Sequence, residues 1–108
     1  MIKLVDPNFG GALAGYLETF TYAELVTALG EPNGQTDGYK VEAEWAVEVN
    51  GTRAYIYDYK VGKSYNGDRG LAVEDITTWH VGSERGWNPD LAAELSQEIR
   101  RTLNGAAE

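Results

Sequence analysis

The hydrophobic and polar residues at positions 40–49 alternate, which is the period of a β-strand with one buried face. The first apolar series consists of Val41, Ala43, Trp45, Val47 and Val49. Asn50-Gly51 follows this series and favours a two-residue type I′ turn, because both turn positions need a positive φ. The pattern therefore predicts a central β-hairpin over about residues 40–60.

A two-residue turn also fixes which residues oppose each other in the hairpin. Val49 would face Thr52, and Trp45 would face Ile56 on the apolar side. The other side carries acids on the first strand and tyrosines on the second, namely Glu42, Glu44, Tyr55, Tyr57 and Tyr59. We therefore expect these five side chains to point away from Trp45.

A short helix is predicted over residues 22–29. Thr21 and Glu24 match a capping box, in which each side chain accepts a hydrogen bond from the backbone N–H of the other residue. A short apolar stripe follows, and Gly30 then gives a stop signal.

Two more elements are predicted in the second half of the chain. β-Branched and aromatic residues at 76–81 favour a third strand. Asn88 as N-cap and Pro89 in the first turn begin a helix over 89–103, whose apolar residues recur every three or four positions. Gly105 marks the expected end of this helix.

The first nineteen residues have the weakest pattern. Residues 2–5 suit an edge strand, residues 9–17 suit a loop or a weak helix, and residues 1–19 together suit an N-terminal arm. With 108 residues, the chain has the size of one ordinary domain. The prediction is a single α+β domain, residues 1–108, built on a small three- to four-stranded antiparallel sheet.

The charge balance restricts the choice of partner. Nine Lys and Arg residues oppose seventeen Asp and Glu residues, which gives a formal net charge of -8. This balance disfavours direct contact with nucleic-acid phosphates and with anionic membranes. It permits a basic partner, such as a nucleic-acid-binding protein, although acidity also serves solubility alone.

The residue types exclude several kinds of site. The chain has no cysteine, which rules out disulfides, thiolate zinc sites and cysteine nucleophiles, and which suits a reducing cytosol. The one histidine lies in no metal-binding pattern, and no motif indicates a cofactor. No apolar run approaches the length of a transmembrane helix.

The side of the hairpin with tyrosines and acids is the first candidate site. Alternating tyrosines are large amphipathic surfaces of the kind found at interfaces, and Glu42 and Glu44 would steer a basic partner toward them. The alternative is that the C-terminal helix packs on this side and buries Tyr55, Tyr57 and Tyr59 in the core. An exposed hairpin edge would also permit a homodimer.

A second candidate is a site for a small anion or a nucleotide signal in the Gly-rich stretch after the hairpin. Lys60, Lys63 and Arg69 would hold phosphate beside glycine N–H groups. Trp79 or a tyrosine would stack on a base, and Arg85 would add a further cation. The alternative is a solvated loop with ordinary charges.

Asp58 and His80 form a third candidate, a functional polar pair. Asp58 falls on the apolar side of the hairpin, where a carboxylate is costly unless it is hydrogen-bonded. A small enzyme would use the two side chains as acid and base if they approach within hydrogen-bond reach at a cleft. The alternative is that each is a structural group satisfied by hydrogen bonds.

Several short segments follow one another in a distinctive order along residues 20–83. They are Gly30-Glu31-Pro32, Asp37-Gly38-Tyr39-Lys40-Val41, Glu44-Trp45, Ile56-Tyr57-Asp58-Tyr59-Lys60 and Trp79-His80-Val81-Gly82. This order resembles a family of short uncharacterised proteins from bacteriophages and actinobacterial prophages. The resemblance implies a small phage accessory protein that acts in the host cytoplasm. It further implies inhibition of a host defence or regulatory protein by direct contact, and it supplies no catalytic residue. Because the chain is also small and acidic and carries the side with tyrosines and acids, we expect an inhibitor of a host defence system such as CRISPR–Cas.

Overall fold

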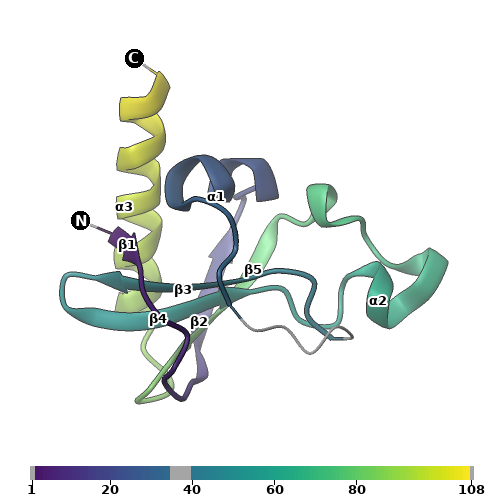
Figure 1. Cartoon of the computed structure of the whole chain (residues 1–108), viewed down its shortest axis with the longest axis horizontal. Helices are drawn as coiled ribbons and strands as arrows, with labels where there is room; N and C mark the ends of the chain where they lie inside the picture. The colour runs from purple at the N-terminus through teal and green to yellow at the C-terminus, as the bar shows by residue number, and fades with distance from the viewer. Residues whose placement is uncertain (1, 35–39, 108) are drawn as a thin grey trace.

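The computed structural model describes residues 2–34 and 40–107, so part of the Asp37-Gly38-Tyr39-Lys40-Val41 segment lies outside the described residues. The strands are β1 (Ile2–Leu4), β2 (Ala12–Glu18), β3 (Glu44–Val49), β4 (Thr52–Tyr57) and β5 (Thr78–Ser83). The helices are α1 (Tyr22–Leu29), the single-turn α2 (Lys63–Asn66) and α3 (Pro89–Ala107), with 3-10 turns at Gly67–Arg69 and Val73–Asp75. The described strands form one antiparallel sheet in the order β1-β3-β4-β5-β2 (Figure 1). The predicted α+β class is therefore confirmed.

The hairpin forms with the register that Asn50-Gly51 predicts. Both turn residues have a positive φ, 48° at Asn50 and 86° at Gly51. β3 and β4 pair along their whole length, and Trp45 faces Ile56 as expected. The tyrosines of β4 therefore point to the side opposite Trp45.

The paired strands are shorter than the predicted range 40–60, and Asp58 marks their end. The Oδ1 atom of Asp58 accepts hydrogen bonds from the backbone N–H groups of Glu42 (2.8 Å) and Ala43 (2.9 Å). These two donors are thus satisfied by a side chain in place of a strand partner. The predicted register would also oppose Glu42 to Tyr59. This pair does not form, because the pairing of β3 with β4 ends at Glu44 and Tyr57.

The N-terminal residues supply both edges of the sheet. The prediction of an edge strand near the start is confirmed by β1, which pairs with β3. The prediction of a loop or weak helix over residues 9–17 is wrong, because β2 occupies this region and pairs with β5. A register shift between Leu13 and Gly15 breaks the strict alternation, and this bulge obscures the strand in the sequence. The sheet therefore has five strands where three to four were expected.

Helix α1 matches its predicted range, and the capping box explains where it begins. The backbone N–H of Glu24 donates to Thr21 Oγ1 (3.1 Å), and the backbone N–H of Thr21 donates to Glu24 Oε1 (2.9 Å). The reciprocal pair satisfies two backbone donors at the helix start.

Strand β5 and helix α3 depart from their predicted bounds. The predicted strand 76–81 begins two residues too early, because Ile76 instead closes a 3-10 turn and is buried in the core. Asn88 caps α3 as expected, with its Oδ1 atom accepting the N–H of Leu91 (3.2 Å). The helix continues past Gly105, because glycine weakens a helix but ends it only where a special backbone angle is needed.

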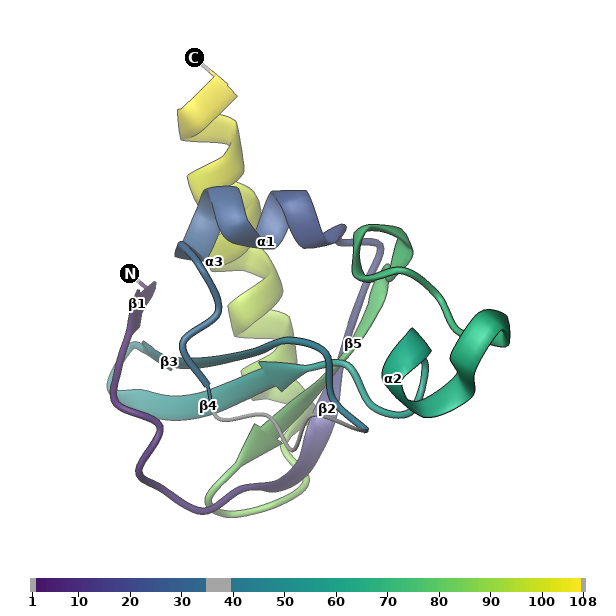
Figure 2. The same ribbon diagram turned by 45° about the vertical axis from the view of Figure 1, so that its right-hand side comes forward.

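Two tryptophans form the centre of the core between the sheet and the helices. The rings of Trp45 and Trp79 lie 5.5 Å apart, and both side chains are fully buried. Their indole N–H groups donate to the backbone oxygens of Gly30 (2.9 Å) and Phe20 (2.8 Å). Leu95 of α3 belongs to the same buried cluster, so α1 and α3 cover the tryptophan side of the sheet (Figures 1 and 2). The alternative that α3 buries the hairpin tyrosines is therefore wrong.

Candidate binding face

A row of four cross-strand partners runs over the side of the sheet that the helices leave uncovered. Glu44 of β3 pairs with Tyr57 of β4, and Tyr57 pairs with His80 of β5. His80 in turn pairs with Tyr16 of β2. Directly opposed residues share one face of a sheet, so the four side chains lie side by side.

His80 lies at the centre of a group of aromatic rings. Its ring centroid is 5.1 Å from that of Tyr16, 5.5 Å from that of Tyr57 and 5.6 Å from that of Tyr59. Trp87 extends the group, with its ring 6.4 Å from Tyr16. We call these five residues the aromatic face.

Three members of the aromatic face are well exposed. The exposed fraction is 64% at Trp87, 44% at Tyr16 and 38% at Tyr59. Exposed large rings that touch one another are unusual on a monomer surface and mark a site of interaction. Tyr57 and His80 are half-buried between them and set the spacing of the exposed rings.

A groove of about 550 Å³ continues the aromatic face between β2 and α3. Tyr16 and Trp87 line both surfaces, and Pro89, Ala92 and Arg100 line the groove on its α3 side. Because the two surfaces share residues, a bound chain would contact both. Sequence reasoning missed Tyr16 and Trp87, because the bulge in β2 hides the strand that carries Tyr16.

Tyr55 does not belong to the aromatic face, although the register points it to the same side. The ring of Phe9 stacks on it at 4.2 Å, and the Tyr55 hydroxyl donates to the backbone oxygen of Phe9 (2.6 Å). A Cβ atom at Gly11 would lie 2.9 Å from the Tyr55 ring, which leaves no room for a side chain there. The β1–β2 connection therefore covers Tyr55, and this ring is structural.

The two predicted acids have different surroundings. Glu44 stands in the cross-strand row beside Tyr57. Glu42 accepts the backbone N–H of Ser64 (2.6 Å) and packs against Gly62, so it holds the loop that follows β4. Of the five predicted contact residues, the structure brings Glu44, Tyr57 and Tyr59 to the aromatic face.

Tyr57 and His80, the two half-buried members of the aromatic face, are uncharged donors and acceptors at neutral pH. Burial, and then the charge of Glu44, raise the pKa of the Tyr57 hydroxyl above its ordinary value. Burial lowers the pKa of His80 below its ordinary value, although the charge of Asp58 opposes this shift. The tyrosine keeps its proton, and the imidazole is neutral.

Asp58 and His80 do not form the acid–base pair that was considered. Among the described residues no hydrogen bond joins them, and Asp58 Oδ2 and His80 Nδ1 are each buried without a partner. Asp58 is fully buried, and its other oxygen binds two backbone N–H groups. Burial raises the pKa of Asp58, and these hydrogen bonds act in the opposite direction. The expectation of a group satisfied by hydrogen bonds is therefore met at Asp58 Oδ1 and not at Asp58 Oδ2 or His80 Nδ1.

The basic residues after the hairpin lie on exposed turns. The Lys60 ammonium lies over the rings of Tyr59 (5.2 Å) and Tyr65 (5.5 Å). Lys63 begins α2, and Arg69 ends the next 3-10 turn. None of the three cations lines the groove between β2 and α3.

Trp79 cannot stack on a nucleotide base as was considered, because it is fully buried in the core. In residues 2–34 and 40–107, no group of three or more His, Asp or Glu side chains is placed to hold a metal ion. No helix within those residues has the length and apolar character to cross a membrane. No family model, curated protein or solved structure matches the chain.

Proposed function

We propose that this protein acts by binding a basic protein partner through the aromatic face and the groove beside it. The observation that carries the proposal is the cross-strand row with Trp87, which keeps contiguous rings on the side opposite the helices. Tyr and Trp are the residues that most often dominate binding energy at protein interfaces. No catalytic group is needed for such an activity.

The charge of the chain supports a basic partner. The net charge is -8, and Glu44 stands at one end of the aromatic row. Lys60 already places its ammonium over the Tyr59 ring, so this ring accepts a cation. A partner with Arg or Lys side chains would make the same contact, and the acidic surface would speed its approach.

The resemblance to short phage and prophage proteins supports a particular class of partner. We propose a host defence protein that binds nucleic acid, such as a CRISPR–Cas effector, as the partner in the host cytoplasm. Such proteins carry basic grooves for phosphates, and an acidic protein that enters the groove would inhibit them.

The test is binding to a panel of purified CRISPR–Cas effectors, measured by biolayer interferometry. Trp87→Ala and Tyr57→Ala should each weaken binding about tenfold or more, because truncated aromatic anchors cost at least about 1.4 kcal/mol. Leu71→Ala is the matched control, since Leu71 is exposed (47%) and lies outside the aromatic face. Full affinity in the two aromatic variants, or an equal loss in Leu71→Ala, would overturn the assignment of the face. Absence of binding to every effector would remove this class of partner.

A further inference from the structure

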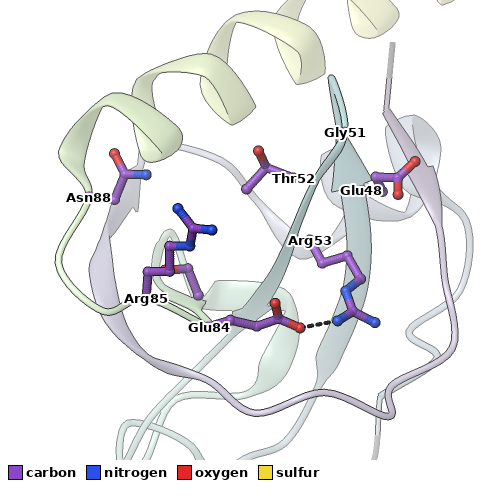
Figure 3. Close-up of a pocket in the computed structure, with 8 residues that line it drawn as sticks. Glu48, Gly51, Thr52, Arg53, Glu84, Arg85 and Asn88 are labelled. Carbon is purple, nitrogen blue, oxygen red and sulfur yellow. Dashed lines mark hydrogen bonds and ion pairs between the residues drawn. The ribbon is translucent and has the colours of Figure 1, made fainter.

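A polar cavity of about 390 Å³ lies where the β3–β4 turn meets the connection from β5 to α3 (Figure 3). None of its lining residues belongs to the aromatic face. Thr52 and Arg53 line it from β4, and Glu84, Arg85 and Asn88 line it from the connection. Its volume is in the range of small-ligand sites.

The two arginines of this cavity differ in what they bind. Arg53 forms an ion pair with Glu84, and its guanidinium lies 4.6 Å from the ring centre of Phe9. Arg85 forms no ion pair with any described residue. In Figure 3 its guanidinium points into the space between Thr52 and Asn88. One positive charge is therefore available inside the cavity.

The neighbours of Arg85 add hydrogen-bond donors to this charge. Asn88 Oδ1 accepts the backbone N–H of Leu91 (3.2 Å), so its amide nitrogen is the end left to face the cavity. Thr52 contributes a hydroxyl from the first residue of β4. A guanidinium, an amide N–H and a hydroxyl together suit a planar oxyanion, which a guanidinium binds with two parallel hydrogen bonds.

We propose that this cavity binds a carboxylate monoanion of amino-acid size, held by Arg85 and oriented by Asn88 and Thr52. A monoanion is favoured over a phosphate dianion because one uncompensated guanidinium balances one charge. Glu48 and Glu84 also line the cavity and would repel a second negative charge. This site is centred on Arg85, which the sequence analysis named only as a further cation beside Lys60, Lys63 and Arg69.

The test is an NMR titration of the isotope-labelled full chain with N-acetylglycine, its neutral amide and inorganic phosphate. N-Acetylglycine should produce saturable shifts in the amides of residues 51–53 and 83–88, with a Kd on the order of 1–10 mM. Phosphate should bind at least about fivefold more weakly, and the neutral amide should give no saturable shift in this range.

Two variants test whether the shifts come from binding at Arg85. Arg85→Gln should weaken N-acetylglycine binding about tenfold or more, because it removes a charge-assisted pair of hydrogen bonds. Arg101→Gln is the control, since Arg101 lies on α3 and pairs with Glu98 (3.0 Å) away from the cavity. The proposal is overturned by the absence of saturable shifts, by unchanged binding in Arg85→Gln, by an equal loss in Arg101→Gln, or by phosphate binding as tightly as the carboxylate.

Discussion

Among single residues, Asp58 shows how one side chain can end a pair of strands. One carboxylate oxygen satisfies the backbone donors of Glu42 and Ala43, while the other is buried without a partner. The sequence predicted a costly carboxylate on the apolar side, but it did not reveal which donors would bind it. Those donors lie fifteen or sixteen positions earlier in the chain and become neighbours only when the hairpin closes.

We predict that Asp58→Asn changes the pH dependence of stability. The folded state raises the pKa of Asp58, so the folded chain holds this proton more tightly than the unfolded chain. The wild type therefore loses stability as the pH rises from about 4 through the folded pKa, whereas the variant has no carboxyl group at this position and no such loss. The stability of the variant relative to wild type should therefore increase between pH 4 and pH 7. Urea unfolding at both pH values measures this, and a pH-independent difference would contradict it.

Among the elements, those with local signals were predictable and those that depend on distant packing were not. The hairpin and α1 follow from the Asn50-Gly51 turn and the Thr21 capping box, which act within a few residues. β2 was missed because its bulge and Gly15 hide a strand that forms only against β5. The aromatic face was predicted only in part, for the same reason. Tyr57 was predicted because it lies on the hairpin, whereas Tyr16 was missed because it lies on β2.

The glycines of β2 and α3 provide a test of this packing. A Cβ atom at Gly15 would lie 3.0 Å from the Ala92 Cβ atom of α3, whereas one at Gly105 would meet nothing within 4 Å. Gly15→Ala should destabilise the fold by about 1 kcal/mol through overpacking. Gly105→Ala should stabilise it by about 0.5–1 kcal/mol, because glycine is a poor helix former. Thermal and urea unfolding would contradict this if both variants changed stability in the same direction.

At the scale of the whole molecule, the net charge of -8 belongs to a fold whose sheet has two different faces. Helices α1 and α3 cover one side of the sheet (Figure 2). The aromatic face occupies the other side. Composition alone gave the sign of the charge but could not say which side a partner would approach. The register of the five strands supplies that information by placing Glu44 in the aromatic row.

We predict that partner association depends on salt and on Glu44. Raising the salt concentration from about 0.05 to 0.5 M should slow association, because screening shortens the reach of exposed charges. Glu44→Lys should slow association about tenfold at low salt and much less at high salt. Glu74→Lys makes the same charge change in the 3-10 turn beside α1 and serves as control. Equal effects of the two substitutions would show that net charge, and not the aromatic row, directs the approach.

The path from β1 to β2 has a consequence for the motions of the sheet. This connection joins the two outermost strands and is fastened near its middle where Phe9 stacks on Tyr55 of β4. Phe9 therefore anchors a segment that continues into both edge strands, so losing its contact with Tyr55 should loosen both edges of the sheet together. In Phe9→Ala, hydrogen exchange should accelerate in β1 and β2 in parallel, while the amides of the β3–β4 pair stay protected.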